Sequence, residues 1–154
     1  MELTSTSIPA GTDIDLRYAE QGAGGENVRP ALAWSDAPEG TKSFAITCYD
    51  PDAPTGSGWW HWVAVDIPAD VTSLEEGAEL PSSVREWVND YGYVGYGGPC
   101  PPPGPAHHYV FTVYAMPTEK LDVPDDAPSA PLRFTILAQA LDEASFTGLF
   151  ALQS

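Results

Sequence analysis

The 154-residue sequence predicts one mainly β domain with a helix near its C-terminus. Three segments either alternate apolar and polar residues or are dense in aromatic and β-branched residues, and both patterns are typical of strands. The 16 prolines and 14 glycines separate short segments and form no single linker, as in a loop-rich β domain. An apolar fraction of 43% suits one packed core, so residues 1–154 are expected to form a single domain.

The strand-like segments follow one another along the chain. Residues 43–50 (SFAITCYD) place alternate apolar side chains on one face and stop at a proline. Residues 59–68 (WWHWVAVDIP) also end at a proline, and their aromatic and β-branched content indicates a strand covered on both faces. Residues 109–116 (YVFTVYAM) alternate most cleanly. These three segments are expected to form the body of the sheet.

The stretch between the second and third strands contains an irregular segment. A short helical turn is expected near residues 83–89. Residues 91–104 (YGYVGYGGPCPPPG) hold five glycines and four prolines, a composition that excludes both a helix interior and a central strand. Loops of this length are uncommon in compact domains and tend to carry function, although an extended surface loop is the simpler alternative.

The last predicted element is an amphipathic helix that packs against the sheet. Ser129 is placed as its N-cap, Pro131 suits its first turn, and Gly148 marks its expected end. The apolar residues at helical spacing are Leu132, Ile136, Leu137, Ala140, Leu141 and Ala144.

The charge balance limits the possible partners. The chain has 22 acidic and 6 basic residues, a net charge of −16. Such a surface repels phosphate backbones and anionic headgroups, which argues against nucleic acid and stable membrane insertion. Self-repulsion destabilises the compact state in dilute buffer but is screened in molar salt, where the Debye length is about 3 Å. The sequence therefore predicts a salt-adapted, halophilic protein, with an ordinary acidic cytosolic protein as the alternative.

The chain is expected to be cytoplasmic. No apolar run approaches the roughly 18 residues that span a bilayer, and residues 1–16 lack a signal pattern. Cys48 and Cys100 lie far apart and match neither a disulfide framework nor a zinc motif, so both are expected to be buried thiols.

The residues able to carry chemistry gather beside the strands and the irregular loop. Asp50 and Asp52 lie in DPDAP, where flanking prolines stiffen the backbone. His61 lies among tryptophans and, if buried, needs a partner, for which a nearby carboxylate is the usual choice. His107 and His108 open the third strand. Taken singly, these features also fit a simple turn and a satisfied core histidine.

The ordered motifs DPDAP, WHW, GYGGPCPPPG and HHYVFTVYAM resemble the bacterial and archaeal branch of the phosphatidylethanolamine-binding proteins, also called Raf kinase inhibitor-like proteins. The resemblance is strongest over residues 43–116. It implies a large central antiparallel sheet packed with a smaller one, Greek-key connections, and one or two peripheral helices including a C-terminal one. It also implies a shallow pocket for a small anion such as phosphate, a phosphoryl headgroup or acetate, with no cofactor.

The resemblance also assigns the pocket residue by residue. Asp50 and Asp52 match the two acids of the family's first motif, and His61 matches the pocket histidine of the following strand. His107 and Tyr109 match the histidine and tyrosine of the family's HRY motif. The residues expected to bind the ligand are Asp50, Asp52, Pro54, Trp60, His61, Gly95, Gly97, Gly98, Pro99, His107 and Tyr109.

Physical chemistry adds two expectations about this pocket and one open question. Carboxylates beside His61 and His107 favour protonated imidazoles, which donate hydrogen bonds to an oxyanion. The loop glycines allow close approach, so their backbone amides are expected to donate as well. His108 stands where the family usually has arginine, which leaves the role of that position open.

Binding without turnover is the leading interpretation of function. The alternatives are a hydrolase that uses an Asp–His pair as a general base, and a divalent-metal site built from the same acids and histidines. A further possibility is regulation of a protein partner, such as a kinase or a protease. The ligand, the partner and the choice between monomer and homodimer stay open.

Overall fold

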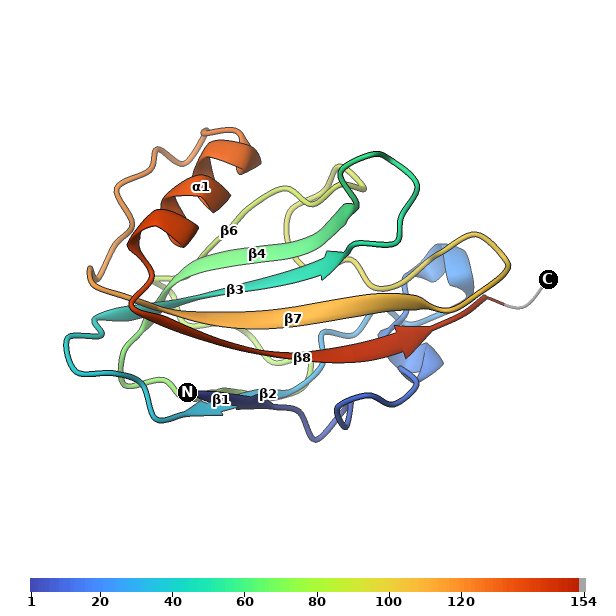
Figure 1. Cartoon of the computed structure of the whole chain (residues 1–154), viewed down its shortest axis with the longest axis horizontal. Coiled ribbons are helices and arrows are strands. Elements are labelled where there is room, and N and C mark those ends of the chain that lie inside the picture. Colours follow the sequence, from blue (N-terminus) through green and yellow to red (C-terminus); the bar gives the residue numbers. More distant parts are fainter. Residues whose placement is uncertain (153–154) are drawn as a thin grey trace.

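The computed structural model describes residues 1–152 and shows two antiparallel sheets and one α-helix. In Figure 1 the larger sheet lies between helix α1 on one side and the small sheet on the other. The strands and the helix are β1 (Glu2–Thr4), β2 (Leu32–Ser35), β3 (Ser43–Asp50), β4 (Trp59–Pro68), β5 (Ser73–Leu74), β6 (Arg85–Glu86), β7 (His107–Met116), α1 (Ser129–Gln139) and β8 (Asp142–Phe150). Two short 3-10 helices, Leu16–Tyr18 and Gln21–Ala23, precede β2.

The larger sheet has the strand order β6-β4-β3-β7-β8. β3 and β4 form a hairpin, and β7 pairs with the free side of β3, so the chain between β4 and β7 must cross over. This crossover is the Greek-key connection that the family resemblance implied. The strands expected at 43–50 and 59–68 are confirmed, and the third begins two residues earlier than expected, at His107.

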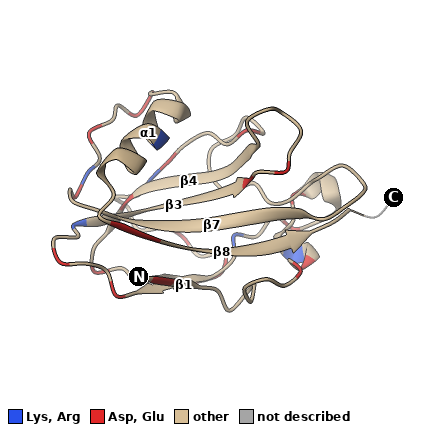
Figure 2. Ribbon diagram, in the orientation of Figure 1, with Lys and Arg blue, Asp and Glu red and all other residues tan. Residues whose placement is uncertain are grey.

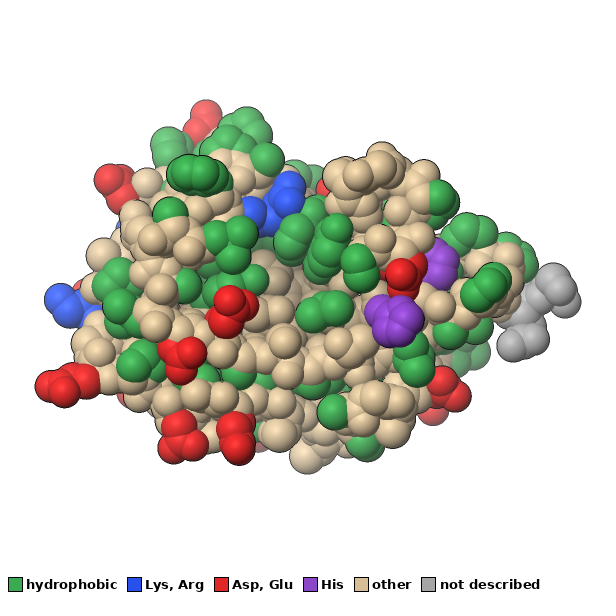
Figure 3. Space-filling model, viewed as in Figure 1, with side chains coloured by type: hydrophobic (Ala, Val, Ile, Leu, Met, Phe, Trp, Pro, Cys, Tyr) green, Lys and Arg blue, Asp and Glu red, His purple; other side chains and the backbone are tan. Residues whose placement is uncertain are grey.

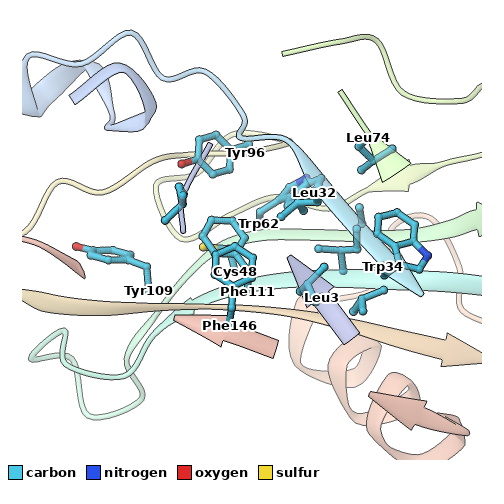
Figure 4. Packing of buried hydrophobic residues seen from close by; sticks show 14 of the residues in the cluster. Leu3, Leu32, Trp34, Cys48, Trp62, Leu74, Tyr96, Tyr109, Phe111 and Phe146 are labelled. Atoms are coloured by element: carbon cyan, nitrogen blue, oxygen red, sulfur yellow. The ribbon is translucent and has the colours of Figure 1, made fainter. Parts of the chain in front are cut away.

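Both faces of the larger sheet are buried. Alternate residues of β3, such as Phe44 and Ile46, join a large core against the small sheet, whose strand order is β1-β2-β5. Ala45 lies on the opposite face, in a second core that includes Leu132 and Ile136 of α1. Figure 4 shows the first core, with the Tyr109 hydroxyl pointing away from the other labelled residues. The alternation of residues along β3 therefore corresponds to two separate cores, one on each face of the sheet.

The C-terminal helix is shorter than expected. It ends at Gln139, and residues 142–150, assigned to the helix or its end, form β8 instead. β8 pairs along its whole length with β7, so tertiary hydrogen bonding outweighs the helical spacing of a few alanines and leucines. Leu137, expected to face the sheet, is 64% exposed. Ser129 is the first helical residue, and Pro128 occupies the cap position without a side-chain cap.

The helical turn expected near residues 83–89 is also wrong. Residues 85 and 86 form β6, an edge strand that pairs with β4. Arg85 donates to the Asp66 carboxylate and to the carbonyls of Leu121 and Val123, so long-range polar contacts fix this segment in an extended form. Within residues 1–152, no helix is long and apolar enough to cross a membrane.

Candidate functional site

A cavity of about 250 Å³ lies at the end of the larger sheet, where β3 ends and β4 and β7 begin. Figure 3 shows histidine side chains on either side of an acidic one at this end of the molecule, away from α1. The cavity lies on the sheet face that carries the large core, since Tyr109 belongs to both. Its lining residues are Asp50, Ala53, Pro54, Thr55, Trp59, His61, Tyr91, Cys100, Pro101, Pro102, His107 and Tyr109.

Asp50 organises one wall of the cavity. It is the last residue of β3 and is only 3% exposed. One carboxylate oxygen accepts the Asp52 backbone N–H at 2.8 Å, and the other lies 2.7 Å from His107 Nδ1. Both oxygens are therefore engaged within the protein. Asp50 fixes the DPDAP corner and the His107 ring, and the second ring nitrogen of His107 keeps its capacity for a ligand.

The second acid of the motif does not line the cavity. The Asp52 carboxylate accepts two hydrogen bonds of 2.7 Å, from the His108 backbone N–H and from His108 Nδ1. These bonds hold the pKa of Asp52 below its usual range. Both side chains of the pair are substantially exposed. The residue in the family's arginine position thus pairs with the first motif, on the outer surface.

His61 lies in the cavity wall because the β3–β4 ladder contains a bulge. Cys48 pairs with Trp62 and Tyr49 pairs with Trp60, so His61 has no partner on β3. A bulge of this kind places two successive side chains toward the same side of a sheet and is frequent next to functional sites. No alternation rule applied to WWHW can anticipate it.

The partner of His61 is a backbone carbonyl, which corrects the expectation of a carboxylate. Its Nδ1 lies 2.7 Å from the Gly97 carbonyl oxygen, and the side chain is almost fully buried. Burial lowers the pKa of His61, and this effect outweighs the opposing influence of the carbonyl and of Asp50. The protonated form expected for this histidine is therefore disfavoured.

The glycines of the long loop shape the wall but do not offer their amides to a ligand. The N–H groups of Gly95, Gly97 and Gly98 donate to the Trp87 carbonyl, the His61 carbonyl and the Asn27 side chain. None of these glycines lines the cavity, and neither does Pro99, whose carbonyl accepts the Glu20 N–H. The expectation of backbone donors in this loop is therefore wrong.

Close packing explains one of these glycines. A Cβ atom at Gly98 would lie 2.0 Å from the Tyr18 carbonyl oxygen, so no larger residue fits there without movement of the backbone. Tyr91 and Tyr96 fasten the same loop through hydroxyl bonds of 2.7 Å to the Gly98 carbonyl and 2.8 Å to the Tyr18 carbonyl. The loop is thus an ordered wall.

Trp60 was assigned to the pocket, but its neighbour Trp59 occupies that place. The Trp60 ring stacks on Tyr49 with ring centroids 4.2 Å apart, under the Arg133 guanidinium on the helix side of the sheet. Sequence reasoning also missed Tyr91, although it lies inside the glycine- and proline-rich loop. The sequence located the segments that line the cavity, but it does not show which of two adjacent tryptophans faces inward.

Two polar groups in the cavity wall lack a protein partner. Trp59 Nε1 and the Tyr109 hydroxyl are both buried and make no hydrogen bond to any residue of 1–152. Tyr109 is 1% exposed, and burial, with a contribution from Asp50, raises its pKa well above the usual range. Tyr109 therefore keeps its proton at neutral pH, and both groups are hydrogen-bond donors without a protein partner.

A cysteine-based hydrolase would require an activated thiol in the cavity, and a metal site would require several converging ligands. Burial raises the pKa of the Cys100 thiol, and Glu20 raises it further, so the cysteine in the cavity is protonated at neutral pH. Among residues 1–152, no three His, Cys, Asp or Glu side chains converge as a metal site would require. The cavity thus offers hydrogen-bond donors, aromatic walls and an Asp–His pair.

Comparison with known proteins identifies relatives along almost the whole chain. A family model described as "Phosphatidylethanolamine-binding protein" matches residues 4–151. The UPF0098 protein YbhB of Escherichia coli K12 is 44% identical over 158 residues, which cover 98% of this chain and 100% of YbhB.

Solved structures agree with this match. E. coli YbcL, described as a new member of the mammalian PEBP family, superposes with a TM-score of 0.92 at 43% identity and covers 99% of this chain and 98% of YbcL. The putative phosphatidylethanolamine-binding protein homologue CT736 of Chlamydia trachomatis superposes with a TM-score of 0.83 at 29% identity and covers 96% of this chain and 95% of CT736.

Proposed function

This chain belongs to the phosphatidylethanolamine-binding protein family, and we propose that it binds a small anion, a phosphate or phosphoryl group, without chemical turnover. The binding site is the cavity at the end of the larger sheet. The observation that carries the proposal is the pair of buried donors without partners, Trp59 Nε1 and the Tyr109 hydroxyl. A buried donor left unsatisfied costs about 1 to 3 kcal/mol, and an anionic acceptor in the cavity removes that cost.

His107 adds a further contact atom, which donates a hydrogen bond when the ring is an imidazolium. Its Nδ1 is held by Asp50 at 2.7 Å, which orients the ring and leaves Nε2 as the atom that meets a ligand. No lysine or arginine lines the cavity. Recognition therefore rests on directed hydrogen bonds, which are stronger when the acceptor is charged.

The same groups support binding over catalysis. Tyr91, Tyr109 and Cys100 have pKa values raised by burial, so each is a weak nucleophile at neutral pH. A hydrolase would release product from a simple phosphate ester incubated with the protein, and we expect no release.

Two wider expectations accompany this proposal. We place the protein in a reducing compartment such as the cytoplasm, which the two free cysteines support. Inhibition of a kinase or protease partner stays a prediction of the family resemblance, separate from the cavity.

Calorimetric titration of inorganic phosphate in molar potassium chloride tests the proposal. We expect saturable binding to the wild type and a loss of about 1.5 to 3 kcal/mol, roughly 10- to 150-fold in affinity, in His107→Ala, because a hydrogen bond to a charged group is removed. His108→Ala is the matched control, since its side chain pairs with Asp52 outside the cavity. Equal loss in both variants, or no loss in either, contradicts this placement of the site.

A further inference from the structure

We propose that the cavity selects an anion that carries its own proton, inorganic phosphate or a singly protonated phosphomonoester, over sulfate and phosphodiesters, because His61 presents a hydrogen-bond acceptor there. This inference rests on the proposed anion-binding function and names the ligand class that the same site takes. It concerns one atom, Nε2 of His61.

The hydrogen bond to the loop determines which nitrogen of His61 carries the proton. Nδ1 lies 2.7 Å from the Gly97 carbonyl oxygen, and a carbonyl can only accept, so Nδ1 must donate. The Gly97 N–H in turn donates to the His61 carbonyl at 2.9 Å, so the two residues hold each other in register. A neutral imidazole has one N–H, and Nε2 therefore has a lone pair.

The surroundings of His61 keep the ring neutral. The side chain is 2% exposed, and the rings of Tyr91 and Tyr109 lie edge-on to it, with centroids 5.6 and 5.1 Å away. Asp50, which lines the cavity, is already bonded to His107 and to the Asp52 N–H, and the pull of Asp50, Asp90 and the Gly97 and Gly98 carbonyls toward a charged ring is weaker than the effect of burial. Burial lowers the pKa of His61, in agreement with this geometry.

The cavity thus combines donors with an acceptor, Nε2 of His61. Trp59 Nε1 and the Tyr109 hydroxyl are donors without partners, and His61 Nε2 makes no hydrogen bond to a residue of the described chain. A complementary ligand has several anionic oxygens and one hydroxyl. Inorganic phosphate has both at neutral pH, whereas sulfate and phosphodiesters have oxygens only. Those ligands would place a lone pair against Nε2, and sites built to bond a hydroxyl reject analogues that lack it.

We expect ligands to be ordered by whether their phosphoryl group can carry a proton. Phosphoethanolamine is a monoester and can carry a proton, but glycerophosphoethanolamine, the headgroup portion of an intact lipid, is a diester and cannot. Because the second pKa of a phosphomonoester is about 6, its protonated fraction grows as the pH falls from 8 to 6. Its affinity should therefore rise as its charge falls, which is the opposite of what simple charge attraction gives.

The test is a set of titrations of the wild type in molar potassium chloride. At pH 7 we expect phosphate to bind at least about tenfold more tightly than sulfate. Between pH 8 and pH 6 we expect phosphoethanolamine affinity to increase relative to glycerophosphoethanolamine. The diester is the control for any effect of pH on the protein itself. Such an effect, through Asp50, His107, Tyr91, Tyr109 or Cys100, would change the affinity of both ligands.

The outcomes separate the two proposals. Equal binding of phosphate and sulfate, with no change in the monoester-to-diester ratio with pH, overturns the selectivity and leaves anion binding intact. No binding of any of the four ligands overturns the anion-binding function itself. In His61→Phe we expect the phosphate-to-sulfate ratio to fall toward one, whereas His108→Ala should keep the wild-type ratio. If His61→Phe does not fold, the wild-type ratios still decide.

Discussion

Asp50 and Asp52 stand two residues apart in one motif and have different roles. Asp50 is buried and bonds to His107 and to the Asp52 N–H, whereas Asp52 holds His108 on the outside. The sequence identified both acids and two of the histidines. It could not show which acid pairs with which ring, because that depends on how β3 and β7 register across the sheet.

Replacing Asp50 should affect stability and binding together. Asp50→Ala leaves His107 Nδ1 and the Asp52 N–H without their acceptor in a buried place, so we expect a loss of about 3 kcal/mol in the free energy of unfolding. Phosphate affinity should fall as well, because the His107 ring loses its orientation. Asp52→Ala removes only the exposed pair with His108, so we expect a loss of less than about 1 kcal/mol in the free energy of unfolding. Chemical denaturation of both variants measures the difference, and similar losses would contradict these roles.

His61 should make stability depend on pH in a known direction. Burial holds its folded-state pKa below the ordinary 6.5, so in the window between these two values the unfolded chain binds a proton that the folded chain does not. Stability conferred by this group is complete above pH 6.5 and falls on acidification, by up to about 1.4 kcal/mol per pH unit.

Denaturant titrations at pH 7, 6 and 5 should show this fall in the wild type. A smaller fall is expected in His61→Gln, which has no titrating ring at this position. Identical pH dependence in the two proteins would mean that His61 titrates normally in the folded state.

At the scale of elements, strands are easiest to predict from sequence where the apolar pattern and the burial of the segment agree. β3, β4 and β7 are buried on both faces, and their aromatic and β-branched residues identify them. Residues 142–150 are more ambiguous, since Ala144 continues the helical spacing of Leu137, Ala140 and Leu141. Only the pairing with β7, from His107–Phe150 to Ala115–Asp142, decides in favour of a strand. Pairing across the sheet is information that a local pattern lacks.

The loop of residues 91–104 should behave as an ordered wall. We expect Gly98→Ala to destabilise the fold by about 1 to 3 kcal/mol, since its Cβ would meet the Tyr18 backbone carbonyl and displace the loop. Gly22→Ala is the matched control, because its Cβ would meet only the ends of the Glu20 and Cys100 side chains, at 3.0 and 3.3 Å. Thermal melts of both variants make the comparison. A neutral Gly98→Ala would show that the loop is loosely packed.

At the scale of the whole molecule, the acidic surface is the dominant feature. Figure 2 shows Asp and Glu on loops and strand ends around the fold, with few Lys or Arg among them. A net charge of −16 on 154 residues repels itself in dilute buffer.

We therefore expect the melting temperature to rise by about 5 °C or more between dilute buffer and molar potassium chloride, where the Debye length is about 3 Å. Differential scanning calorimetry across the salt series measures this. An unchanged or falling melting temperature would rule out adaptation to high salt.

The sequence also predicted much of the candidate site as a set of segments. The motifs around Asp50, His61 and His107 do meet at one cavity. The bulge that turns His61 inward, the choice of Trp59 over Trp60 and the internal bonding of the glycine amides were not predictable. Each depends on backbone geometry that side-chain patterns do not encode.

The most direct test of anion binding follows the indole N–H signals of the five tryptophans by nuclear magnetic resonance while inorganic phosphate is added. Trp59 and Trp34 both have a buried indole nitrogen without a protein partner, but only Trp59 lines the cavity. We expect a saturable shift of the Trp59 signal, assigned with Trp59→Phe, and an unmoved Trp34 signal. A Trp59 signal that stays in place at saturating phosphate would contradict this expectation.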